Sequence, residues 1–288
     1  MTTPPPRTNP VLQHSAFYRF VRLPQPSLAA EAVRSAAQDL QGSIVLAPEG
    51  INGTVAGAPA AVARFEAALT AADFCHGAFQ GMAFKHSACL TPPFGRLKVS
   101  VKSEIVALGL PAQMSSSGPL PPPDETDASH LTPTQWRELL GQGQAVVLDN
   151  RNHFEFRLGH FHGAVDPQVH NFRDFVAYVL AQAPTWRAQQ RPVAMYCTGG
   201  IRCDKTAPWM RSLGLQVWQL EGGVLNYFAQ LPDAQQDWQG ECFVFDNRVA
   251  LDTRLQETAS TVDDVFDPHH PDEAWRLQRA RRLDAGTG

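Results

Sequence analysis

The sequence contains no long hydrophobic run. Crossing a bilayer takes about 20 consecutive apolar residues, and no stretch of the 288 residues approaches this length. Residues 1–15 (MTTPPPRTNPVLQHS) are polar and proline-rich and lack the apolar centre of a signal peptide. These absences argue against membrane-spanning and secretory segments, so we expect a cytoplasmic protein with no membrane partner.

Cysteine and positive charge are also scarce. The five cysteines are an odd number and do not suit a disulfide framework, so we expect reduced thiols. A formal net charge of −4 excludes a polycation that would hold nucleic acid by its overall charge. Nucleic-acid binding would therefore require a local concentration of basic residues.

A segment of linker composition divides the chain. MSSSGPLPPPDETD (Met114–Asp127) is rich in serine, glycine and proline and has no apolar periodicity. We predict a first domain over residues 11–112, a linker over 113–128, a second domain over 129–235 and a C-terminal extension over 236–288.

Strand and helix signals alternate in the first domain. Ser27 is suited to cap the first predicted helix, and Gly42 to end it. Two helices among about four strands predict a ferredoxin-like α+β sandwich. The predicted strands cover residues 16–23, 43–47 and 96–108, with a tight turn into a further strand over 48–57, and the predicted helices cover 27–42 and 60–72.

The second domain alternates more regularly. Short apolar strands separated by helices predict an α/β domain with a doubly wound parallel sheet. Ligands of such sheets bind at the carboxyl ends of the strands. The predicted strands cover residues 145–151, 191–197 and 216–220, and the predicted helices cover 131–143, 172–182, 203–214 and 224–231.

One of these strands ends in Cys197, and CTGGIRC leads from it into the next helix. Glycines allow the loop to curl with its backbone N–H groups towards the sulfur, and the helix N-terminus and an arginine add positive potential. We therefore predict a nucleophilic thiolate on Cys197 that faces solvent at the rim of the sheet. The alternative is an inert, buried cysteine. The loop that would stabilise the anion consists of Thr198, Gly199, Gly200, Ile201 and Arg202.

The length of this loop distinguishes two chemistries. Cysteine-dependent phosphatases use a longer Cys-x5-Arg loop that surrounds a phosphate, whereas four residues separate Cys197 from Arg202. The shorter loop suits a single sulfur atom better than a phosphoryl group. This spacing is the pattern of rhodaneses.

Further motifs resemble the same family. LDNRNHFEFRLGHFHGA (Leu148–Ala164) is similar to the Asp-x-Arg, Glu and Gly-His-x-x-Gly-Ala elements of rhodanese domains, and LEGGV (Leu220–Val224) to their Gly-Gly turn. With LAPEGINGTVAG, FGRLKVSVKSEIVALG and GECFVFDNRVALD, residues 15–255 resemble the rhodanese-containing tRNA uridine(34) hydroxylases.

That resemblance implies an activity and a set of partners. It implies formation of 5-hydroxyuridine at the wobble position of tRNA, with molecular oxygen as co-substrate and Cys197 as the reactive cysteine. Some relatives carry further cysteines after the Phe-Val-Phe-Asp segment that look like a metal site, but residues 250–288 contain none. We therefore expect no metal, and we identify no other cofactor.

Five other side chains in the second domain could take part in the chemistry or bind a metal. Cys203 is either a resolving thiol for an oxidised Cys197 or a packed helix residue. Asp149 and Arg151 either pair and shape the loop, or Arg151 meets the substrate. His160 and His162 do not have the spacing of zinc ligands, and His160 is expected to bond locally in a turn. The remaining cysteines are expected to be packed thiols.

A basic stripe is predicted in the first domain. If residues 96–102 form a strand, the two-residue period places Arg96, Lys98 and Lys102 on one face and leaves Leu97, Val99 and Val101 for the core. Lys85 and Arg19 are possible additional members. Such a stripe can follow the phosphate backbone of RNA, and the alternative is an ordinary solvated face.

Three functions remain open at this stage. We predict a tRNA-modifying oxidoreductase in which Cys197 either adds to C6 of the uridine or carries an oxidised or persulfide sulfur. A sulfurtransferase acting through a Cys197 persulfide is the first alternative, although it would not need the first domain. A binding module with an inactive rhodanese domain is the second.

Overall fold

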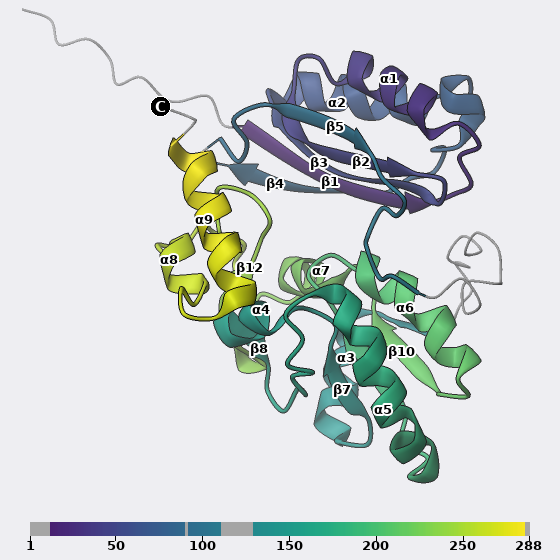
Figure 1. Cartoon of the computed structure of the whole chain (residues 1–288), viewed down its shortest axis with the longest axis vertical. Helices are drawn as coiled ribbons and strands as arrows, with labels where there is room; N and C mark the ends of the chain where they lie inside the picture. The colour runs from purple at the N-terminus through teal and green to yellow at the C-terminus, as the bar shows by residue number, and fades with distance from the viewer. Residues whose placement is uncertain (1–11, 90–91, 111–128, 286–288) are drawn as a thin grey trace, which may run out of the picture. The chain divides into compact units, whose positions relative to one another are not determined.

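The computed structural model describes residues 12–89, 92–110 and 129–285 (Figure 1). Contacts within the chain divide it into two compact units, Met1–Ile105 and Val106–Gly288. The predicted first domain, 11–112, therefore extends past this division, and the predicted linker lies outside the described residues. In the part of the chain that is described, no helix is long and apolar enough to cross a membrane.

The first unit is a five-stranded sheet with two helices on one face (Figure 1). Its elements are β1 (Leu12–Phe20), α1 (Pro26–Ala36), β2 (Gln41–Ala47), β3 (Gly50–Gly57), α2 (Pro59–Leu69), η1 (Phe74–Gly77), β4 (Phe84–Cys89) and β5 (Leu97–Val101). The strand order is β4-β1-β3-β2-β5, and every neighbouring pair is antiparallel except β2 and β5. This topology confirms the predicted ferredoxin-like fold, with β5 added at its edge.

The two faces of this sheet have different roles. Ile44 of β2 is fully buried against the helices, and its neighbour Val45 points to the opposite face because side chains alternate along a strand. On that opposite face, cross-strand pairing places Tyr18, Asn52, Val45 and Ser100 in one row. The sheet therefore has one face in the core and one face away from the helices.

The end of α1 differs from the prediction. The helix is preceded by Gln25 rather than capped by Ser27, and it ends at Ala36, with Ala37 as its C-cap. Gly42 lies within β2, where an added Cβ would come within 2.2 Å of the Thr54 carbonyl oxygen. The glycine is required by the close approach of two strands, and its role as a helix terminator was wrongly predicted.

The edge strand β5 is shorter than the predicted strand. Leu97 and Val99 pack against the core, but Val101 is 44% exposed, so its predicted core position is wrong. An edge strand has a neighbour on one side only, which leaves its end uncovered. The basic residues of the predicted stripe, Arg96, Lys98 and Lys102, are exposed.

A four-stranded parallel sheet organises the second unit. Its elements up to residue 230 are β6 (His130–Leu131), α3 (Pro133–Gln142), β7 (Val146–Asp149), α4 (His153–Leu158), β8 (Gly159–Phe161), η2 (Phe172–Asp174), α5 (Phe175–Ala188), β9 (Val193–Tyr196), α6 (Ile201–Ser212), β10 (Val217–Leu220) and α7 (Gly223–Gln230). The strand order is β6-β10-β9-β7, with every pair parallel. The predicted parallel sheet is confirmed.

Helices cover this sheet on both faces, as a doubly wound fold requires. In β9, Val193 and Met195 belong to the core formed with α5 and α6. Ala194 and Tyr196 belong to the core formed with α3 and α7. All four side chains are fully buried. Cys197, the next residue, therefore lies at the end of a strand that helices cover on both faces.

The C-terminal extension is part of the second unit. The short helix η3 (Ala234–Gln236) leads into it, and it contains β11 (Trp238–Gly240), β12 (Cys242–Phe243), β13 (Ala250–Leu251), α8 (Val262–Val265) and α9 (Pro271–Ala285). β11 pairs with β8, and Phe154 of α4 packs between Phe243 and Phe266. The extension therefore shares a core with α4.

Candidate active site

The loop after β9 forms the predicted amide cradle around Cys197. The Gly200 backbone N–H donates a hydrogen bond to the Cys197 sulfur at 3.1 Å, and the N–H groups of Arg202 and Cys203 also point to it. Gly200 has φ +100°, which L side chains rarely adopt. Because α6 begins at Ile201, the sulfur also lies at the N-terminus of a 12-residue helix, where positive potential is concentrated.

Cys197 is buried rather than open to solvent. It is 1% exposed and belongs to the core between the sheet, α5 and α6. The prediction of a solvent-facing sulfur is therefore wrong, because a strand covered on both faces has no exposed rim at this position. The loop above it is more open, since Thr198, Gly199 and Ile201 are half-buried.

The sulfur is nevertheless poised as a thiolate. Burial is the largest single influence and on its own would raise the pKa of Cys197. A hydrogen bond from the Cys203 thiol, the charge of Arg202 and the two backbone N–H groups outweigh it and lower the pKa from 9.0 to about 5. The thiolate is therefore the main form at neutral pH, and it is the nucleophilic form.

Cys203 has the opposite character. Burial, followed by the hydrogen bond to Cys197 and the negative charge on that residue, raises the pKa of Cys203 well above its usual value. Its thiol stays protonated and donates to the Cys197 sulfur. Cys203 of α6 is 1% exposed in the core, as the packed-residue alternative predicts, and it also donates a hydrogen bond to the Cys197 sulfur. The resolving role stays a prediction.

The loop arginine does not point freely into the site. Arg202 donates two hydrogen bonds of 2.7 Å to Glu155 of α4, and both side chains are buried. Burial is the largest single influence and alone would raise the pKa of Glu155. The charge and hydrogen bonds of Arg202, the charge of Arg151 and the backbone N–H of Asn152 together outweigh it and lower that pKa. Thr198 lies 3.4 Å from the same carboxylate. The ion pair ties the reactive loop to α4 and partly neutralises the arginine.

Sequence reasoning gave Glu155 no role beyond its place in the family motif. A charged residue between two phenylalanines, in the sequence FEF, is a usable signal, because a buried carboxylate needs a cationic or hydrogen-bonding partner. The partner itself cannot be read from a local pattern, since Arg202 is distant in sequence.

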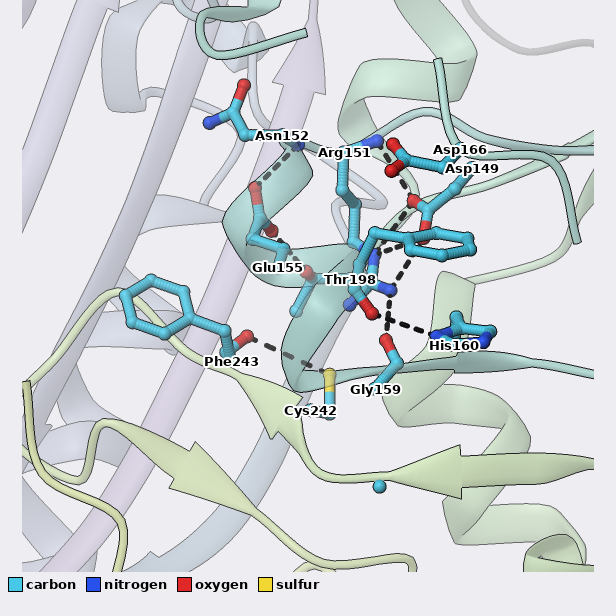
Figure 2. A network of polar contacts seen from close by, with 12 residues as sticks. Asp149, Arg151, Asn152, Glu155, Gly159, His160, Asp166, Thr198, Cys242 and Phe243 are labelled. Atoms are coloured by element: carbon cyan, nitrogen blue, oxygen red, sulfur yellow. Dashed lines mark hydrogen bonds and ion pairs between the residues drawn. The ribbon is translucent and has the colours of Figure 1, made fainter. Parts of the chain in front are cut away.

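Asp149 and Arg151 form a second buried pair beside the first (Figure 2). Arg151 donates to Asp149 at 2.6 Å and to the Gly159 carbonyl at 2.6 Å. Its guanidinium lies 5.2 Å from the ring centre of Trp238. Both charged side chains are 0% exposed, so the geometry favours the structural alternative over contact between Arg151 and a substrate.

Gly223, in the predicted Gly-Gly turn, packs against the backbone of the Cys197 loop. An added Cβ on Gly223 would lie 2.4 Å from the Cys197 carbonyl oxygen and 2.8 Å from the Gly200 nitrogen. The neighbouring Val224 N–H donates to the Cys197 carbonyl at 2.9 Å. The N-terminus of α7 therefore fixes the backbone of the reactive loop.

The predicted basic residues lie in the other unit. By its pairing with Ser43, Lys98 shares the sheet face of Ser100 and Tyr18, and Lys85 lies over the Tyr18 ring at 5.7 Å. Arg19 follows Tyr18 directly and therefore points to the opposite face, so it does not belong to this stripe.

His160 forms the predicted local bond. Its Nδ1 lies 2.9 Å from the Phe156 carbonyl oxygen, and the two rings stack with centres 3.9 Å apart. His162 is exposed. The remaining cysteines, Cys75, Cys89 and Cys242, are not disulfide-bonded and are at least half-buried.

Within the described ranges, one group of side chains offers three possible metal ligands. The ligand atoms of His170, His270 and Glu273 lie within 4.8 Å of one another. The histidine rings stack face to face at 3.8 Å, so their in-plane lone pairs run side by side instead of converging. Arg157 also binds Glu273 at 3.0 Å. A metal here would have to displace the arginine and turn a ring.

Comparison with known proteins agrees with this architecture. Residues 12–105 match the UPF0176 acylphosphatase like domain, and residues 132–230 match the rhodanese-like domain. The match of the first unit to an acylphosphatase-like domain agrees with its ferredoxin-like topology.

Full-length relatives extend the match across both units. A tRNA uridine(34) hydroxylase of Nitrobacter winogradskyi is 41% identical over 259 residues, covering 88% of this chain and 98% of the relative. Proteins of the same name from Deinococcus radiodurans and Bradyrhizobium diazoefficiens are 41% and 40% identical, covering 84% and 86% of this chain and 77% and 95% of their own. The chain belongs to the tRNA uridine(34) hydroxylase family.

Proposed function

We propose that this chain hydroxylates C5 of uridine 34, the wobble uridine of tRNA, with Cys197 as the nucleophile. The observation that carries the proposal is the Cys197 thiolate, whose pKa is lowered to about 5. It lies at the carboxyl end of a parallel strand, where such sheets bind their ligands. The substrate is proposed from the names of the relatives, and the sulfur of Cys197 is proposed as the reactive atom from the geometry of the loop.

The proposed reaction begins with addition of the thiolate to C6 of uridine. The C5–C6 electron pair moves onto C5 and the C4 carbonyl, and C5 then combines with molecular oxygen and a proton to form a hydroperoxide. Two external thiols supply two electrons and two protons, become a disulfide, and reduce the hydroperoxide to a hydroxyl group and water. Loss of the C5 proton and departure of the Cys197 thiolate release 5-hydroxyuridine.

A second route places the oxidised or persulfide sulfur on Cys197 itself. The same amide cradle would stabilise the terminal anion of a persulfide, so this alternative also depends on Cys197. In both routes the buried sulfur must be reached, and the target base must leave its stack. The half-buried Thr198 and Gly199 are the loop residues that the base would have to move past.

The test uses purified protein, unmodified tRNA, a thiol reductant and ¹⁸O₂. We expect 5-hydroxyuridine that carries ¹⁸O, no product under argon, and no product with Cys197→Ser, all measured by mass spectrometry of nucleosides. Cys75→Ser, a half-buried thiol of the first unit, is the matched control and should retain activity. Product made by Cys197→Ser would remove the proposed role of the cysteine.

The sulfurtransferase remains the rival because the loop suits it equally well. Rapid thiosulfate-to-cyanide sulfur transfer by the full chain, together with the absence of 5-hydroxyuridine under every condition, would favour the rival. Incorporation of ¹⁸O into the nucleoside would decide for hydroxylation, since sulfur transfer introduces no oxygen.

A further inference from the structure

An aromatic side chain lies unusually exposed beside the reactive loop. Phe245 follows β12 and is 60% exposed, although the three residues before it, Cys242, Phe243 and Val244, are all buried. Single exposed apolar residues are ordinary on protein surfaces. Two further observations distinguish this one: the backbone that holds it is rigid, and its neighbour belongs to the active site.

A buried ion pair fixes the turn that presents Phe245. Arg248 binds Asp246 at 2.7 Å, and the two side chains are 1% and 4% exposed. The Arg248 backbone N–H also donates to Asp246 at 3.0 Å, and the ring of Phe243 meets that of Phe245 edge to face at 5.0 Å. A turn built in this way holds the exposed ring in one place, which lowers the entropy cost of binding a ligand to it.

The ring of Phe245 faces the arginine of the reactive loop. The Arg202 guanidinium lies 5.9 Å from the ring centre, and Glu155 holds that guanidinium with two hydrogen bonds of 2.7 Å. The same arginine lowers the pKa of Cys197. Arg202 therefore interacts both with the exposed ring of Phe245 and with the Cys197 thiolate.

We propose that Phe245 is a base-binding residue on which the extruded uridine 34 stacks while Cys197 reacts with it. This inference rests on the proposed function. Proteins that read unpaired bases stack them on aromatic rings, and here an exposed ring is held against the arginine whose charge acts on the nucleophile. A phenyl ring has no hydrogen-bonding groups. Phe245 would therefore hold the base in place by stacking, and other contacts would distinguish uridine from the other bases.

The first experiment compares kcat/KM for tRNA hydroxylation by Phe245→Ala, Phe245→Leu and Phe245→Tyr with that of the wild type. Loss of stacking is expected to lower kcat/KM by about 5- to 150-fold in the alanine and leucine variants, with rescue by tyrosine. Trp275→Ala is the matched control, because Trp275 is also exposed and lies over an arginine, Arg276, at 4.6 Å. Equal activity of the leucine variant and the wild type would overturn the proposal.

The second experiment separates stacking from damage to the loop. Affinity is measured with anticodon stem-loop RNA that has either uridine or an abasic site at position 34. Phe245→Ala should weaken binding of the first RNA and leave the second unchanged, while the rate of Cys197 alkylation stays at the wild-type value. Equal loss with both RNAs, or slower alkylation, would refute stacking on base 34. Absence of hydroxylation by the wild-type protein would instead refute the proposed function.

Discussion

The two sheets of this protein use their faces in opposite ways. The first sheet packs helices on one side, and its other side carries polar and aromatic side chains such as Tyr18 and Asn52. The second sheet is covered on both sides, and the four residues of β9 are fully buried. The first sheet therefore offers a surface, whereas the second offers only the ends of its strands.

This difference changes what a basic side chain does. In the first unit Lys98 and Lys102 are exposed to solvent. In the second unit Arg151 and Arg202 are buried, and each is paired with a carboxylate at 2.6–2.7 Å. Charge in the second unit fixes the geometry of the reactive loop, and charge in the first unit is available to a polyanion.

The largest expected effect comes from breaking a buried pair. Glu155→Gln leaves the Arg202 charge without its carboxylate, and losing one partner of a buried pair typically costs about 3–5 kcal/mol. We expect the second unit to unfold at a much lower denaturant concentration. All six tryptophans lie at or beyond Trp136, so tryptophan fluorescence reports on this unit alone.

An exposed pair of the same unit provides the control. Asp263 and Arg281 are paired, but their side chains are 52% and 59% exposed. Asp263→Asn should change the free energy of unfolding by less than about 1 kcal/mol. Equal destabilisation by both variants would show that burial does not determine how much these ion pairs contribute to the free energy of unfolding.

The next effect is a change in the titration of Cys197. Cys203→Ala removes a donor to the thiolate and should raise the pKa of Cys197 above its present value of about 5. In the wild type, the rate of iodoacetamide alkylation should be constant near neutral pH and fall below about pH 5, and in the variant the fall should begin at higher pH. Cys89→Ala, in the first unit, should leave the profile unchanged. An unaltered profile in Cys203→Ala would assign the low pKa to the amides and Arg202 alone.

Much of the fold could be predicted from the sequence because its signals are local. Apolar periods predicted the α/β alternation and the loop after residue 197. The missed elements are short or weakly patterned: α4 spans only His153–Leu158, and β4 (FKHSAC) has no clear alternation. Gly42 was misread because a glycine can end a helix or admit a neighbouring strand, and only the β2–β3 contact decides between the two.

The site was predicted less completely because its contacts join distant segments. The residue types around Cys197 identified a thiolate loop, and the amide cradle follows from them. Glu155, which holds Arg202, lies on a different element, and so does Phe245. The burial of Cys197 depends on helices covering both faces of the sheet, which is a property of the assembled unit and not of the CTGGIRC segment.

The smallest expected effect concerns the open face of the first sheet. Removing both charges with Lys98→Ala and Lys102→Ala should weaken tRNA binding several-fold and reduce the slope of log affinity against log salt by about 2. Arg64→Ala is the control, since Arg64 lies on α2 and pairs with Asp39 at 3.2 Å. Alkylation of Cys197 should not change in either variant, because this surface acts through RNA. An unchanged salt slope in the lysine variant would mean that these lysines are ordinary solvated residues, and that the polyanion is held elsewhere.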